Sequence, residues 1–383
     1  MWAFFISRQY REGREYLLAG DETVATKVGK ETHGVGRFFS SLFGKPISGI
    51  SFFGLSLIDV EARRSIPIRI EQFIREKLEK GKSLEKKAAA KKAKSAKEKK
   101  PRGRPKGSKN KNKETAPFSA ELMQIQGMLK KFQEQNAGFL KIKHIVMDGH
   151  FGNKNALRMA LECGLELISK LRHDSALFEP FTGEYRGKGP RPRYGSKIDY
   201  ANLPEKYLKK TSTEKDVQTR FYQAQLLHKE FKNPLNIVIL EKTNLKTQAK
   251  AHVVFFSSDL DLSYEKMVDF YSLRFQIEFN FRDAKQFWGL EDFMNVTPTA
   301  VTNFANLSFF MVNFSHQLLA DFRNTNPEAG LIDLKAHYRG RLYLDEAIKM
   351  LEKKPEPFLL AQIYSKLAHI GQIHPIHHLL TGT

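Results

Sequence analysis

Short apolar runs separated by polar turns fill the first part of the chain. Three of these runs have the length and pattern of β-strands: residues 15–20 (EYLLAG), 51–60 (SFFGLSLIDV) and 65–71 (SIPIRIE). Because they follow one another closely, we predict an antiparallel meander. Asp21 comes directly after the first run, and Asp59 lies near the end of the second.

The pattern changes to helix and strand between residues 119 and 171. Residues 119–136 carry apolar side chains at helical spacing, and residues 143–147 (KHIVM) form an apolar run that ends at Asp148. Asn153 can cap a helix over residues 154–163, and a further strand is expected at 165–171. Strand, helix and strand within about thirty residues form a βαβ unit with a parallel strand pair.

The region that follows predicts more strands and then helices. Residues 174–215 are rich in Gly, Pro, Lys and Tyr, and strand-like runs follow at 221–227, 235–241 and 252–256. We predict that residues 172–260 form a β-rich insertion that lies on the core and does not continue its sheet. From Tyr264 onwards the pattern is mostly helical.

Four polar residues in the segment DFYSLRFQIEFNFRDAKQFWGL share one helix face. Tyr271, Arg274, Glu278 and Lys285 have offsets of 0, 3, 7 and 14, so they fall within a sector of roughly 60° if the segment is one helix. A stripe facing a hydrophobic core would not contain these residue types. A carboxylate flanked by cationic groups suits phosphodiester chemistry, in which acidic side chains hold divalent ions and Arg or Lys binds phosphate.

The amino-acid composition predicts that the protein binds a polyanion. The 383 residues have a net charge of +21, which indicates nucleic acid first and an anionic membrane second. No stretch approaches the length of an apolar membrane span, which disfavours the membrane. The single cysteine, Cys163, excludes an intramolecular disulfide and a Cys-rich zinc site, and is compatible with a reducing cytoplasm.

Much of the positive charge lies in one segment. Residues 79–113 contain 16 Lys and Arg and 3 Glu, and their low apolar content predicts a disordered linker. Within it, Arg102 and Arg104 flank a glycine and precede Pro105, which resembles the core of an AT-hook. These two arginines are therefore candidates for binding an A·T-rich minor groove. The alternative is a flexible tether whose charge merely follows DNA.

These motifs together resemble the DDE transposases of bacterial insertion sequences. The helical Y-x2-R-x3-E-x6-K stripe is similar to the Y-R-E-K signature of that family, and IVMDGHFGN and YLLAGDETVATKVGKETHG are similar to its second and first aspartate regions. The resemblance covers about residues 15–320. It implies an α/β fold with an RNase H-like core, a β-rich insertion and a mainly helical C-terminal part.

The resemblance also implies site residues and chemistry. Asp21, Asp148 and Glu278 would bind two divalent metal ions, either Mg²⁺ or Mn²⁺. Tyr271, Arg274 and Lys285 would contact DNA phosphates. Asp59 is the rival for the first position; Asp21 is preferred because the first acid of such a fold lies on its first strand. Partners would be transposon ends and target DNA, with a homodimer assembled on the DNA, in the bacterial cytoplasm.

Two alternatives and one departure accompany this interpretation. A non-transposing nuclease on the same fold and a DNA-binding protein without catalysis are the competing functions. Asp21 lies so near the N-terminus that the helical DNA-binding region usual in the family has no room, so we expect either an N-terminally truncated fragment or a decayed copy. The expected regions are 1–78, the first part of the core; 79–117, the linker; 118–171, the second part; 172–260, the insertion; and 261–383, the helical region.

Overall fold

The computed structural model describes residues 9–40, 44–74, 117–136, 140–185, 187, 189–367 and 370–374. The predicted linker with Arg102 and Arg104 lies outside the described residues. The strands are β1 (Tyr16–Thr26), β2 (Gly36–Ser40), β3 (Lys45–Asp59), β4 (Arg64–Phe73), β5 (His144–Met147), β6 (Glu166–Leu171), β7 (Leu177–Pro180), β8 (Tyr194–Lys197), β9 (Leu208–Glu214), β10 (Val217–His228), β11 (Leu235–Asn244) and β12 (Lys250–Ser257).

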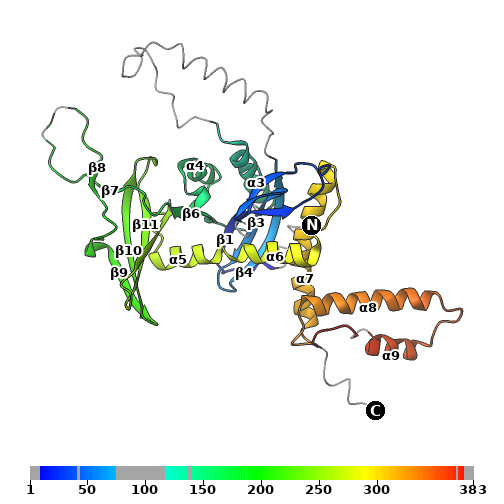
Figure 1. The fold of residues 1–383 in the computed structure, drawn as a ribbon. Helices are drawn as coiled ribbons and strands as arrows, with labels where there is room; N and C mark the ends of the chain where they lie inside the picture. Colours follow the sequence, from blue (N-terminus) through cyan, green and yellow to red (C-terminus); the bar gives the residue numbers. More distant parts are fainter. Residues whose placement is uncertain are drawn as a thin grey trace, which may run out of the picture.

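Helices cover both faces of the sheet that these strands form (Figure 1). The α-helices are α3 (Ala120–Asn136), α4 (Lys154–Glu162), α5 (Tyr264–Leu273), α6 (Gln276–Trp288), α7 (Pro298–Phe322), α8 (Leu331–Lys349) and α9 (Pro357–Leu367). Two short 3-10 helices are η1 (Gly149–Phe151) and η2 (Glu205–Tyr207). In the described part of the chain no helix is long and apolar enough to cross a membrane.

The predicted meander is present and is larger than the sequence indicated. β1 pairs antiparallel with β3, and β3 pairs antiparallel with β4. β1 does not end at Gly20, because all its residues as far as Thr26 pair with the long strand β3. β2, which was not predicted, pairs with the first residues of β3.

The βαβ unit formed as predicted. β5 and β6 are parallel, and β5 also pairs in parallel with β1. Asn153 caps α4, because its side-chain oxygen accepts hydrogen bonds from the backbone N–H groups of Asn155 and Ala156, both at 3.1 Å. The strand order β4, β3, β1, β5, β6 is consistent with the RNase H-like arrangement.

The expectation of an insertion separate from the core sheet was wrong. Residues 172–260 do contain mostly strands, but β12 pairs antiparallel with β6, so β12, β11 and β10 extend the core sheet. In the described residues the result is one sheet of 12 strands. The insertion returns to the edge of the core because the buried run at the end of β12 satisfies the open edge of β6.

Two hydrophobic clusters, one on each face of the sheet, follow from strand alternation. Leu18 and Met147 face the cluster under α3 and α4, whereas Leu17, Ala19 and Val146 face the cluster under α5, α6 and α7. The helices α8 and α9 extend beyond the end of α7, away from the sheet (Figure 1). The alternation decides which strand residues face α5 and α6.

Candidate active site

The parallel register brings Asp21 and Asp148 together. Ala19 is level with Val146, and Gly20 with Met147, so one residue further along Asp21 lies beside Asp148 on strands about 4.8 Å apart. Alternation points both side chains to the face that α5 and α6 cover, because Ala19 and Val146 face that side. Two acidic residues 127 positions apart in the sequence thus become neighbours.

Glycine lets α6 approach this part of the sheet. Gly54 on β3 is the partner of Asp21 on β1. A Cβ added to Gly54 would lie 2.6 Å from a ring carbon of Phe281 on α6, so the helix rests directly on this glycine. A larger residue at this position would push α6, and with it Glu278, away from Asp21.

The predicted single helix is broken at the functional stripe. α5 ends at Leu273 and α6 begins at Gln276, with Arg274 and Phe275 forming a turn between them. The backbone N–H groups of Ile277 and Glu278 donate to carbonyls three residues earlier, as in a 3-10 turn. The turn keeps Arg274 and Glu278 on the side that faces the sheet.

Arg274 connects two of the three predicted metal ligands. Its Nη1 donates to Asp21 Oδ2, and its Nη2 donates to Glu278 Oε1 at 3.2 Å. The Arg274 side chain is only 14% exposed, against 15% for Asp21 and 41% for Glu278, so the first pair is shielded from water. A guanidinium is therefore the cation that compensates these carboxylates.

Asp21 carries an unfavourable charge in this setting. Its pKa is raised to about 6, chiefly by burial; Arg274 and the Glu22 N–H oppose this rise, and the carboxylates of Asp148 and Glu278 add to it. Asp148 directly follows β5, accepts a hydrogen bond from the backbone N–H of His150 at 3.1 Å and is partly exposed. Asp148 and Glu278 are thus each close enough to Asp21 to affect its charge.

Tyr271 and Lys285 occupy different places. Tyr271 is buried beside Arg274, whose guanidinium lies 5.8 Å from the centre of the Tyr271 ring, and burial raises the pKa of the phenol. Lys285 donates to the backbone carbonyl of Val24 at 2.7 Å and forms an ion pair with Glu291 at 3.2 Å. Its ammonium group is therefore held on β1, three residues beyond Asp21.

Asp59, the rival for the first acid, lies at the far end of the same strands. It pairs with Tyr16 in the β1–β3 register, five residues or about 17 Å along β1 from Asp21. It accepts hydrogen bonds from Arg14 at 2.8 Å and from the Ala62 N–H at 2.9 Å, and so stabilises the turn after β3. The geometry groups Asp21, not Asp59, with Asp148.

Lys170 is a residue of this site that sequence reasoning missed. It lies on β6, two residues beyond Ile168, which is level with Val146 on β5, so the register places it beside Asp148. Its Nζ lies 4.6 Å from the centre of the Tyr271 ring, and burial, followed by the charge of Arg274, lowers its pKa. The signal in the sequence was a lysine inside the apolar strand LELISKL.

The three carboxylates are suitable ligands for a divalent metal ion, although in the described structure their oxygen atoms do not converge on one point. Three carboxylates offer the hard oxygen ligands that Mg²⁺ and Mn²⁺ prefer, and their mutual repulsion would be relieved by a cation. As the side chains stand, no three acidic, histidine or cysteine residues in the described ranges are grouped to hold a metal ion. Arg274 instead engages carboxylate oxygens of Asp21 and Glu278.

Comparison with known families identifies the chain. A family model described as DDE superfamily endonuclease matches residues 6–232, more than half of the sequence. The chain belongs to the DDE superfamily endonucleases. The family acts on DNA and generally uses divalent metal ions. No curated protein matches the chain significantly.

The match divides the site of this DDE superfamily endonuclease in two. The matched residues include Asp21, Asp148 and Lys170 and end between β10 and β11, before α5 and α6 begin. Glu278 and the rest of the helical stripe lie outside the matched residues, so their part in the site rests on the geometry around Arg274.

Proposed function

We propose that this DDE superfamily endonuclease is a DNA transposase in which Asp21, Asp148 and Glu278 bind two divalent ions, Mg²⁺ or Mn²⁺. When bound, the ions would activate the attacking oxygen and stabilise the leaving one. The proposal is carried by one observation: two acids on adjacent parallel strands face a helix that brings a third acid to them through Arg274.

The side chains around the acids have roles in this proposal. Arg274 would bind a DNA phosphate with a planar pair of N–H donors, which suits a phosphate oxygen as well as a carboxylate. Tyr271 holds Arg274 and Lys170 in place with its ring. Lys285 would reach DNA only after leaving the carbonyl of Val24, so we assign it to DNA that lies along β1.

The reaction proposed is hydrolytic nicking at transposon ends followed by attack of the freed 3′-hydroxyl on target DNA. Strand transfer distinguishes a transposase from a nuclease on the same fold. A pair of chains, each holding one DNA end, would bring the two ends together. Arg102 and Arg104 remain candidates for minor-groove binding.

Nicking of supercoiled plasmid with Mg²⁺ or Mn²⁺ tests the catalytic assignment. We expect Asp21→Asn, Asp148→Asn and Glu278→Gln each to lower the nicking rate by at least about 10²-fold, because each removes a charge that the reaction needs. Asp269→Asn is the matched control: Asp269 on α5 also pairs with an arginine, Arg63, at 2.7 Å, but both side chains are largely exposed.

Three outcomes separate the competing functions. Nicking together with joining of linear duplex ends into a plasmid supports a transposase. Nicking without joining identifies a nuclease that does not transpose. DNA binding without metal-dependent nicking of the wild-type chain rejects the catalytic proposal and leaves a binding protein.

A further inference from the structure

Lys170 holds an ammonium group near the Asp148 carboxylate, but it forms no ion pair with any carboxylate of the described residues. Among the described residues it forms no ion pair and no hydrogen bond through this group; it lies on the rings of Tyr271 and Phe255, with Nζ 4.6 and 5.7 Å from their centres. The side chain is only partly exposed. Aromatic rings attract a cation but do not accept its three hydrogen bonds as oxygen atoms do.

Two other shielded lysines on aromatic rings, one buried and one partly buried, donate hydrogen bonds to oxygen atoms. Lys27 lies over Phe293 and donates to the backbone carbonyls of Glu291 and Phe293 at 2.6 and 2.8 Å. Lys335 lies over Trp288 and donates to the carbonyl of Phe287 at 2.7 Å. Lys170 differs from both because no described oxygen atom fills this role.

The surroundings of Lys170 favour an anion from outside the chain. Arg274 is close enough to repel Lys170, and the buried Nε of Arg274 has no hydrogen-bond partner among the described residues. Two cationic side chains with donors left over, both held by the ring of Tyr271, would be stabilised by a group with several acceptor oxygens. Asp148 attracts Lys170 electrostatically, but among the described residues no ion pair or hydrogen bond joins the two, so the donors of the ammonium group stay unsatisfied.

We propose that Lys170 and the Nε of Arg274 bind one phosphate of the DNA backbone beside Asp148. This proposal rests on the proposed function of the same site, since it takes DNA as the ligand. The phosphate would lie between β6 and the α5–α6 turn, on the side of Asp148 opposite to Asp21. Lys170 would thus fix the DNA strand relative to the acids, and Tyr271 would fix Lys170.

Protection of lysines from acetylation tests the contact without requiring catalysis. The full chain is treated with an acetylating reagent in EDTA, with and without a saturating 40-base-pair duplex, and the labelled peptides are quantified. We expect the duplex to slow acetylation of Lys170 several-fold and to leave Lys335 unchanged, because the ammonium of Lys335 is engaged by the carbonyl of Phe287. Equal labelling of Lys170 with and without DNA overturns the proposal.

Substitution supplies the second measurement. For Lys170→Met we expect the slope of log K against log salt concentration for the same duplex to become shallower by about 0.9, the value for one phosphate contact. Lys170→Arg should keep the slope, as should the control Lys335→Met. An unchanged slope and an unchanged KM for plasmid nicking in Lys170→Met count against the contact.

The two proposals fail in different ways. If Lys170 is protected and the slope changes but the wild-type chain does not nick DNA with metal, the phosphate contact stands and the catalytic assignment falls. If nicking depends on Asp21, Asp148 and Glu278 while Lys170 is neither protected nor needed for the slope, the phosphate contact is wrong and the catalytic assignment stands.

Discussion

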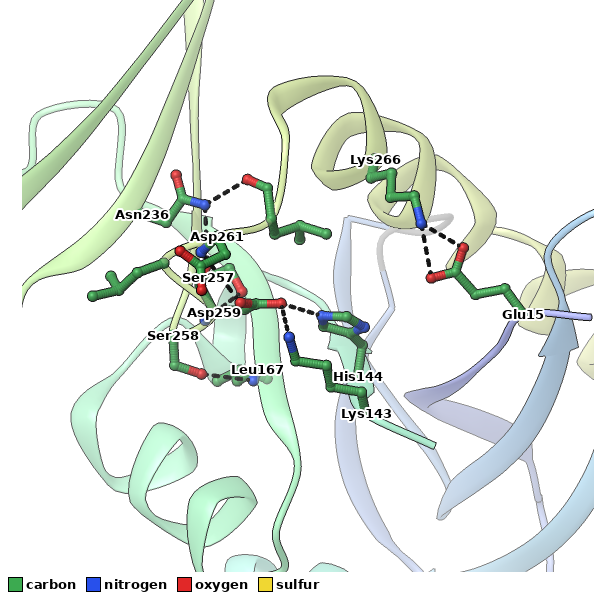
Figure 2. A network of polar contacts seen from close by, with 12 residues as sticks. Glu15, Lys143, His144, Leu167, Asn236, Ser257, Ser258, Asp259, Asp261 and Lys266 are labelled. Atoms are coloured by element: carbon green, nitrogen blue, oxygen red, sulfur yellow. Dashed lines mark hydrogen bonds and ion pairs between the residues drawn. The ribbon is translucent and has the colours of Figure 1, made fainter. Parts of the chain in front are cut away.

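The acidic side chains at the two ends of β5 differ in how fully hydrogen bonds and cations compensate their charge. At the N-terminal end, Asp259 accepts hydrogen bonds from His144 at 2.8 Å and from Lys143 at 2.7 Å, as Figure 2 shows, and from the backbone of Asp261. At the C-terminal end, Asp148 lies near Asp21, and the Arg274 guanidinium connects Asp21 to Glu278. The strand between them is only four residues long.

The pKa values of the two aspartates record this difference. Burial alone would raise the pKa of Asp259, but the hydrogen bonds from Lys143, His144 and the Asp261 N–H outweigh it, so the pKa is lowered. For Asp21 burial prevails and raises the pKa to about 6. One end of the strand therefore gains stability from its carboxylate, while the other holds carboxylates whose charges the fold does not fully compensate, as expected of a site that receives cations and DNA.

Removal of the satisfied carboxylate should have the largest effect on stability. Asp259→Ala leaves the buried His144 without its partner and Lys143 without its ion pair, so we expect a loss of about 2–4 kcal/mol in the free energy of unfolding. Urea unfolding at pH 7 measures it. Asp269→Asn, which breaks a largely exposed pair, should cost less than about 1 kcal/mol. Equal losses in the two variants would show that the network in Figure 2 does not stabilise the fold.

Removal of the uncompensated charge should have the opposite sign and a pH dependence. The folded pKa of Asp21 is about 6, above the ordinary value of 3.8, so its ionisation lowers stability as pH rises from about 4 to 6. The Asp21→Asn variant has no carboxyl group at this position, so its stability does not fall in this way as the pH rises. Its stability relative to the wild type should therefore rise across that window by at most about 3 kcal/mol, while the loss of the Arg274 partner shifts the difference equally at every pH. Thermal unfolding in EDTA at several pH values checks this; a constant difference would contradict it.

Displacement of α6 should have a smaller effect on stability. Gly54→Ala forces a Cβ against the ring of Phe281, so we expect a cost of about 1–3 kcal/mol and slower nicking, because Glu278 moves away from Asp21. Gly127→Ala is the control: its Cβ on α3 would meet nothing within 4 Å, and alanine should stabilise the helix by up to about 1 kcal/mol. If Gly54→Ala nicks at the wild-type rate, α6 does not depend on this contact.

Local pattern predicted much of the core. Apolar runs identified β3, β4, β5 and β6, and the cap at Asn153 identified the start of α4. The same reasoning ended β1 at Gly20, because polar residues follow. The strand continues to Thr26 since β3 is long enough to pair with it, and the pairing residues of β3 lie 23 to 33 positions further along the sequence.

Long-range pairing explains what local pattern missed. The sequence gives no sign that β12 would pair with β6, because each run is compatible with either a separate or a shared sheet. The break at Arg274 and Phe275 was likewise hidden, since both residues fit a helix. Lys170 became a site residue only through the parallel register that places it beside Asp148, and periodicity within one strand cannot reveal a neighbour on another.

The junction of β12 with β6 also bears on aggregation. A core sheet that stopped at β6 would present a row of unpaired N–H and C=O groups, to which a strand from another molecule could add. β12 occupies that row from Ile168 to Leu171. The insertion therefore protects an edge strand that could otherwise pair with another molecule. A chain from which the insertion is deleted would be expected to self-associate through β6 even if its acidic site were intact.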